Sequence, residues 1–180
     1  DQALDYVTQS LKISENLGDK QGMITALNVC GMIFKNMGEF DKSLNAHSRY
    51  YNIAYELDDK LGMGKALRNS GFTSCYTGDY NQCLNYFSRS LKIDQEIDNK
   101  FGIGESFFGM GFAWLEMGDY KKALDYETRS LKIVEKIGAK WEIAGVNQMI
   151  GESHYFIGNS LEANRYFEKS VVIWREMGNK

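Results

Sequence analysis

The chain has 180 residues and a formal net charge of −3, with 25% charged, 43% hydrophobic and 13% aromatic residues. This composition indicates a soluble globular chain and excludes a disordered one, because apolar and aromatic residues are plentiful. Its mild acidity argues against nucleic-acid binding through a large basic surface, and no apolar run approaches the roughly 20 residues of a membrane-spanning helix.

A period of 40 residues runs through the whole sequence. The similar tetrapeptides LGDK, LDDK, IDNK, IGAK and MGNK end at Lys20, Lys60, Lys100, Lys140 and Lys180. Glycines recur in the same register, and residues 61–100 and 101–140 are identical at 16 of 40 aligned positions. A period of this length indicates an array of stacked supersecondary units.

Residues 1–20 are expected to form the second helix of an incomplete unit, because ALDY at 3–6 matches ALDY at 123–126. The first residue is aspartate, and the sequence starts in the middle of the pattern. We therefore expect the chain to be a piece of a longer protein, with the rest of that protein among its partners.

Each complete unit is expected to contain two helices. In the first unit, apolar residues at helical spacing predict a helix over 21–37, and the glycine-led turn GEF follows at Gly38. Asp or Asn after the equivalent glycines is expected to cap a long second helix, such as 119–137. The complete units are 21–60, 61–100, 101–140 and 141–180.

One helical hairpin cannot bury its apolar face alone, whereas stacked hairpins bury a continuous core. The sequence therefore predicts an all-α fold, a right-handed α-solenoid of antiparallel helix pairs with nine helices. Residues 1–180 are expected to form a single array.

A set of positions within each unit carries a family resemblance. The third unit shows them best, at Phe107, Met110, Gly111, Trp114, Gly118, Asp119, Tyr120, Ala123, Leu124 and Tyr126. This pattern resembles the tetratricopeptide repeat, in a 40-residue form without proline, whereas the usual repeat has about 34 residues. The longer form is similar to adaptors of the Partner of Inscuteable type and to bacterial regulatory tetratricopeptide proteins. The resemblance implies protein or peptide binding in a concave groove lined by the first helices, and no catalysis.

The fourth unit departs from the pattern at four positions, Asn147, His154, Ser160 and Asn164. Two interpretations stay open: a looser unit beside a further domain, or a locally specialised surface.

The three cysteines, Cys30, Cys75 and Cys83, are odd in number and form no C-x-x-C pair. We expect neither a disulfide framework nor a zinc site, and a reducing, cytoplasmic setting. Cys30 and Cys83 fall at core-facing positions, whereas Cys75 falls on the groove face. His47 and His154 lie in different registers and are expected to pack or to be polar surface residues. Since no acid, base and nucleophile converge, we expect no catalytic residue, no metal and no cofactor.

The geometry of the family projects one face of each first helix into the groove, at spacing i, i+3, i+7, i+10 and i+11. The partner-binding residues expected on this face are Asn28, Met32, Lys35, Lys65, Arg68, Phe72, Tyr76, Glu105, Phe108, Phe112, Leu115, Glu152, Tyr155 and Phe156. The aromatic members would form an apolar stripe, basic towards the N-terminal end and acidic towards the C-terminal end. The alternative for each aromatic ring is that it packs into the neighbouring unit.

These residues favour a non-catalytic scaffold that binds a protein or peptide segment with apolar anchors. The alternative is a ligand- or peptide-sensing regulatory module that controls an attached effector domain, and a structural spacer is a further possibility. Binding to the C-termini of chaperones is disfavoured. The resemblance implies that members of this kind hold the terminal carboxylate with Lys, Asn and Arg at set positions of the first helices. The residues at these positions are Asn28, Met32, Asn69, Glu105 and Ser106, and only Asn69 matches.

Overall fold

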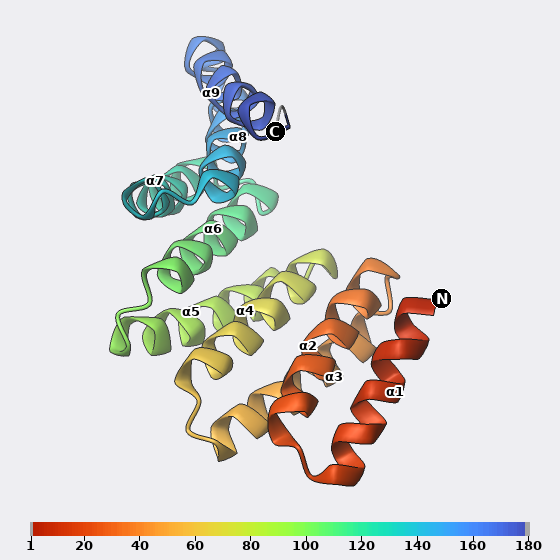
Figure 1. The fold of residues 1–180 in the computed structure, drawn as a ribbon. Coiled ribbons are helices and arrows are strands. Elements are labelled where there is room, and N and C mark those ends of the chain that lie inside the picture. The colour runs from red at the N-terminus through yellow and green to blue at the C-terminus, as the bar shows by residue number, and fades with distance from the viewer. Residues whose placement is uncertain (1, 179–180) are drawn as a thin grey trace. The chain divides into compact units, whose positions relative to one another are not determined.

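The computed structural model describes residues 2–178, which form nine helices and no strand (Figure 1). The helices are α1 (Gln2–Leu17), α2 (Lys20–Asn36), α3 (Phe40–Glu56), α4 (Lys60–Tyr76), α5 (Tyr80–Glu96), α6 (Lys100–Glu116), α7 (Tyr120–Ile137), α8 (Lys140–Ile157) and α9 (Ser160–Gly178). The expected all-α fold of helix pairs is confirmed. Asp1 and the end of the MGNK motif at Lys180 lie outside the described residues.

The chain divides into two compact units, α1–α5 and α6–α9, at the connection between Ile97 and Asp98. In each unit every helix packs against the next one in the chain. The first helices also meet one another, α2 with α4 and α6 with α8. The single array expected over 1–180 stays a prediction.

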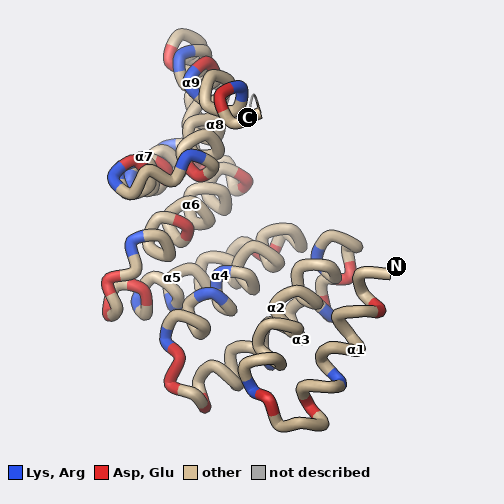
Figure 2. The backbone as a smooth tube through the Cα atoms, viewed as in Figure 1, with Lys and Arg blue, Asp and Glu red and all other residues tan. Residues whose placement is uncertain are grey.

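Left-handed residues end most of the helices, as the glycine pattern predicts. They are Gly18, Gly38, Gly78, Gly118, Gly138 and Gly158, together with the non-glycine residues Asp58 and Asp98. Most of the following helices begin with a side-chain cap: Asp19 accepts from the Gly22 amide at 3.0 Å, and Asp119 from the Lys122 amide at 3.2 Å. Figure 2 shows acidic residues at these connections between helices. Glu39 and Ala139 precede helices without a side-chain cap.

A glycine in each first helix faces a large residue of the following second helix. The facing pairs are Gly31 and His47, Gly71 and Phe87, Gly111 and Glu127, and Gly151 and Phe167. A Cβ atom on any of these glycines would lie less than 3.0 Å from the facing side chain. The absence of a side chain at this position therefore permits the two helices of each pair to approach closely.

Arg68 lies in the interior, where Nη1 is 2.5 Å from Oδ2 of Asp94 and donates to Ser90 Oγ at 3.2 Å. The two charged side chains are only 4% and 0% exposed. The expectation that Arg68 lines an open groove is therefore wrong. Helical spacing assigned it to the groove face, but Asp94 on α5 provides a buried partner that the spacing on α4 alone could not reveal.

Cys75 and Cys83 are joined by a disulfide that links the end of α4 to the start of α5. The expectation that the cysteines form no disulfide framework does not hold for this pair, and Cys75, which the sequence places on the groove face, is buried. The two cysteines are eight residues apart, and the α4–α5 turn folds them against each other with their Cα atoms 5.3 Å apart. Cys30 is a buried free thiol, and burial raises its pKa.

Two of the residues that face the helix glycines are ionisable. Burial, reinforced by the charge of Lys35, lowers the pKa of His47 to about 4, and its Nδ1 has no hydrogen-bond partner. Burial raises the pKa of Glu127 to about 7, with a further contribution from Glu152 and against the hydrogen bond that Ser153 donates to Oε1 at 3.0 Å. Burial therefore keeps both side chains uncharged at slightly acidic pH.

The buried Arg68–Asp94 pair yields a first prediction. Asp94→Ala leaves the Arg68 charge buried without its partner, so it should lower the free energy of unfolding by about 3–5 kcal/mol. The matched control is Glu96→Ala on the same helix, which removes the exposed ion pair with Lys60 and should cost less than about 1 kcal/mol. Urea unfolding followed by far-UV circular dichroism measures both. Equal costs for the two variants would contradict this role of the pair.

Glu127 yields a second prediction, on pH. Its pKa is about 7 in the folded chain, above the ordinary value of 4.5, so the stability that neutral Glu127 contributes to α6–α9 should be complete below pH 4.5 and should be lost as pH rises through 7. The loss should be about 3 kcal/mol, and Glu127→Gln should remove this dependence.

All three tryptophans, Trp114, Trp141 and Trp174, lie in this unit, so tryptophan fluorescence reports its urea unfolding. Glu135→Gln, at an exposed position on the same helix, is the control and should keep the pH dependence of the parent chain. A parent chain whose stability does not change between pH 4.5 and 7 would disprove the neutral Glu127.

Candidate functional site

A pocket of about 400 Å³ lies at the ends of α6 and α8 in the second unit. We call it the α6–α8 pocket, and its lining residues are Leu115, Glu116, Tyr120, Glu152, Tyr155, Phe156 and Phe167. Four of the residues expected to bind a partner therefore come together here: Leu115, Glu152, Tyr155 and Phe156. Leu115 is only 6% exposed, so it contributes a buried apolar surface of the pocket.

Aromatic rings form the walls of the α6–α8 pocket. Phe156 stacks on Tyr120 with ring centroids 5.1 Å apart and planes 12° apart, and it meets Tyr155 edge to face at 5.6 Å. Tyr155 and Phe156 are 63% and 55% exposed. Large rings that stay exposed in a concave site are the residues on which binding energy usually concentrates.

Two carboxylates give the α6–α8 pocket a negative charge. Glu152 accepts a hydrogen bond from Gln148 Nε2 at 2.9 Å, and Glu116 is exposed. Neither forms an ion pair with a Lys or Arg of residues 2–178. The carboxyl-terminal ends of α6 and α8, at Glu116 and Ile157, add the partial negative charge of helix ends. The pocket is therefore suited to a cationic group beside an apolar one.

The other residues expected on this face of the second unit are half-buried. Phe108 packs against the cluster formed by Val134, Val146 and Ile150, so much of its ring belongs to the core. Glu105 and Phe112 are also half-buried. For Phe108 the alternative interpretation, packing into the neighbouring helices, describes the structure better than an exposed anchor does.

The first unit carries the basic part of the expected face. The Lys35 Nζ lies 5.3 Å from the centroid of the Tyr76 ring, and burial lowers the pKa of Lys35. Met32 and Tyr76 are 48% and 61% exposed, and Lys65 is exposed. The half-buried Asn28 accepts a hydrogen bond from Asn69 at 2.8 Å, which links α2 to α4.

Phe72 turns towards the interior of the first unit. It is half-buried, and its ring meets Phe87 edge to face with centroids 4.9 Å apart. The continuous aromatic stripe expected across both units stays a prediction, since its members lie in two separately described units.

Two residues of the α6–α8 pocket, Tyr120 and Phe167, were not expected from the sequence. Tyr120 belongs to the GDY turn and was assigned to the repeat pattern, and Phe167 lies on a second helix. Both reach the pocket because it lies at the turn end of the helix pairs. The prediction considered one face of each first helix only, so it could not include residues of the turns or of the second helices.

Residues 2–178 contain no group of His, Cys, Asp or Glu arranged to hold a metal ion. None of the helices formed by these residues is long and apolar enough to cross a membrane.

The comparisons with known proteins agree with this fold. Residues 62–136 match the family model described as the tetratricopeptide repeat. None of the curated proteins compared matches the sequence.

Among solved structures, the chain is similar to BtubC from P. vanneervenii, with a TM-score of 0.74 and 13% identity over 90% of this chain and 67% of that one. It is also similar to a signal transduction ATPase with a tetratricopeptide repeat sensor from Pyrococcus horikoshii, with a TM-score of 0.77 and 18% identity over 94% of this chain and 26% of that one. A Rap protein complexed with Competence and Sporulation Factor has a TM-score of 0.74 and 13% identity, over 98% and 59% of the two chains.

The chain thus spans about a quarter of the ATPase and about three fifths of the Rap protein. At these identities the likeness concerns the fold. Residues 62–136 thus match the tetratricopeptide repeat family, and helix pairs with the same 40-residue period lie on either side of them.

Proposed function

We propose that the chain is a non-catalytic interaction scaffold, whose first-helix faces bind a segment of a protein or peptide partner. The observation that carries this proposal is the α6–α8 pocket, where exposed aromatic rings and two carboxylates surround a space of about 400 Å³. Such a combination of an apolar wall with a few polar groups is typical of a recognition site.

The chemistry of the α6–α8 pocket favours a basic side chain of the partner. A Lys or Arg is attracted by Glu116 and Glu152, and its cation is also attracted by the faces of aromatic rings such as Tyr155. An apolar neighbour in the partner would pack on Phe156 or Leu115. The partner segment is therefore expected to combine a basic residue with an apolar anchor.

The face of the first unit favours the opposite charge. Lys35 and Lys65 accompany the exposed Met32 and Tyr76 on α2 and α4. A partner segment that contacts this face is expected to carry acidic residues. Charge complementarity of this kind sets the orientation of a bound segment and speeds its association.

A second candidate function is a sensor module that controls an attached effector domain. Two of the similar structures support it: one has a tetratricopeptide repeat sensor within a larger ATPase, and the other is a Rap protein in complex with a factor. Both functions use the same face, and they differ in whether binding changes the activity of a neighbouring domain.

The proposed recognition of a basic segment yields the third prediction. Random peptides displayed on phage and selected on the chain should converge on a Lys or Arg next to an aromatic or branched aliphatic residue. A synthetic peptide with that consensus should bind Glu116→Gln/Glu152→Gln about tenfold more weakly, because two partly desolvated charge interactions are lost. Fluorescence anisotropy of the labelled peptide measures the affinity.

The charge-matched control is Glu135→Gln/Glu168→Gln, which neutralises two exposed carboxylates on the second helices α7 and α9. This control should keep the affinity of the parent chain. A consensus without a basic residue, or equal weakening by both double variants, would contradict the proposed site.

A further inference from the structure

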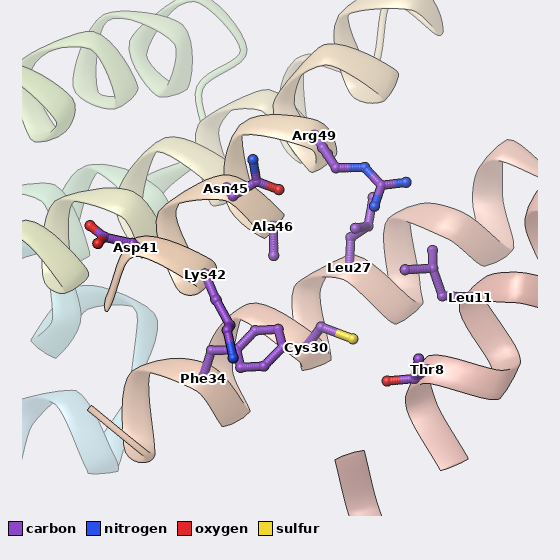
Figure 3. Close-up of a pocket in the computed structure, with 10 residues that line it drawn as sticks. All are labelled: Thr8, Leu11, Leu27, Cys30, Phe34, Asp41, Lys42, Asn45, Ala46 and Arg49. Atoms are coloured by element: carbon purple, nitrogen blue, oxygen red, sulfur yellow. The ribbon is translucent and has the colours of Figure 1, made fainter. Parts of the chain in front are cut away.

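A second pocket, of about 380 Å³, lies in the first unit between α1, α2 and α3 (Figure 3). Its lining residues are Thr8, Leu11, Leu27, Cys30, Phe34, Asp41, Lys42, Asn45, Ala46 and Arg49. We call it the Ala46 pocket. The α2 residues that line it are not those of the proposed partner face, so it is a separate site.

The sequence repeat explains why this pocket exists. Ala46 occupies a register position at which the other second helices carry tyrosine, at Tyr6, Tyr86, Tyr126 and Tyr166. The last three of these tyrosines are half-buried in the structure. The first complete 40-residue repeat, 21–60, therefore lacks an aromatic ring that all the later repeats possess.

Contacts in the later units show what surrounds the tyrosine. The Tyr126 ring lies 6.2 Å from the Phe107 ring, and the Arg129 guanidinium lies 5.4 Å and 4.2 Å from these two centroids. The Tyr166 ring stacks on His154 at 5.7 Å, with the Lys169 ammonium 4.6 Å from its centroid.

The unit that follows the Ala46 pocket repeats this arrangement. The Arg89 guanidinium lies 6.0 Å from the Tyr86 centroid and 5.5 Å from the Tyr51 centroid. In each of the later units, a cation three residues after the tyrosine thus lies near its ring, at the distance of a cation–π interaction.

The Ala46 pocket has side chains at the positions of these neighbours, with leucine in place of two of the aromatic ones, and keeps the cation. Counting back by whole 40-residue units, Leu11 corresponds to Tyr51, Leu27 to Phe107, Phe34 to His154, and Arg49 to Arg89, Arg129 and Lys169. In Figure 3 the side chains of Leu11, Leu27, Cys30 and Ala46 gather around one space, and Asp41 points away from it. The pocket thus has an apolar wall and a cation at the positions that surround a tyrosine ring in the later repeats, and it lacks the ring.

We propose that the Ala46 pocket binds a tyrosine side chain supplied by a partner protein. Its ring would lie against Phe34 and Leu27, as Tyr166 lies against His154 and Tyr126 against Phe107. Arg49 would supply the cation at the ring. The Thr8 hydroxyl and the Asn45 amide at the pocket offer hydrogen-bond partners for the phenol group.

The proposal goes beyond the binding of a segment by the first-helix faces, because it adds a site that the second helices α1 and α3 form with another face of α2. Arg49 forms an ion pair with Glu15 at 2.6 Å, and Lys42 pairs with Glu39. The pocket therefore has little free positive charge, and a neutral aromatic ring suits it better than an anion.

N-acetyl-tyrosinamide is the probe for this site, because it presents the tyrosine side chain between two peptide groups. Titration followed by amide chemical shifts should show saturable binding centred on Cys30, Ala46 and Arg49. N-acetyl-leucinamide should bind at least tenfold more weakly, since it lacks the ring. Equal binding of the leucine probe would overturn the assignment of an aromatic site.

Ala46→Tyr is the decisive variant, because it fills the pocket with the ring that the later units carry. It should abolish binding of the probe and raise the urea midpoint of the first unit. The control is Ser48→Tyr, which adds the same side chain at an exposed position of α3 and should change neither property. Undiminished binding to Ala46→Tyr would disprove the proposal.

Substitution of Arg49 tests the role of the cation without filling the pocket. Arg49→Gln should weaken binding of the probe about threefold through the lost cation–π interaction. Arg49→Lys should bind like the parent chain, because Lys169 fills the same position beside Tyr166. Equal affinities for all three chains would overturn the role of the cation.

Two measurements separate a partner's tyrosine from other occupants. If 4-methylphenol binds more tightly than N-acetyl-tyrosinamide, the pocket takes a small phenol and the partner assignment is wrong. If sedimentation shows a dimer that both Ala46→Tyr and Tyr6→Ala abolish, the occupant is a second copy and the assignment is equally wrong. Peptides selected on the chain and counter-selected on Ala46→Tyr should instead share one fixed tyrosine.

Discussion

The close approach of two helices at a glycine is the constraint on which each repeat depends. A large side chain of the second helix lies directly on the first helix at this position, and the facing residue is His47, Phe87, Glu127 or Phe167. Because glycine has no Cβ, the backbone of the first helix packs directly against this side chain of the second helix. The spacing fixes which faces of the first helix turn away from the second, and these faces carry the residues proposed to bind partners.

The interior tolerates different chemistry at this crossing. Two units place an aromatic ring there, and two place an ionisable group that burial holds neutral. Ser153 supplies one hydrogen bond to Glu127, whereas the second oxygen of this carboxyl group and Nδ1 of His47 stay without a partner. The fit of volume against glycine is therefore the shared requirement, and the polarity of the residue sets how each helix pair responds to pH.

Much of the fold could be predicted from the sequence, because the 40-residue period, the glycine turns and the caps are local signals. The buried Arg68–Asp94 pair and the disulfide of Cys75 and Cys83 could not be, since each depends on a contact between two helices that the pattern of one helix does not reveal. Four expected residues do meet in the α6–α8 pocket, but Tyr120 reaches it from the first turn of the second helix α7. The Ala46 pocket had a signal in the sequence, the missing tyrosine, which becomes meaningful only when its neighbours are known.

Within each compact unit, a helix contacts only its neighbours and the next-but-one helix in the chain. Among residues 2–178 no helix closes back on a distant one, so the topology of each unit has low contact order and suits rapid folding from any helix pair. The same feature makes length an adjustable property. Duplication or loss of a whole 40-residue repeat would add or remove one equivalent junction and leave the interior of the other repeats unchanged. Such a chain can therefore change its length in evolution by whole repeats.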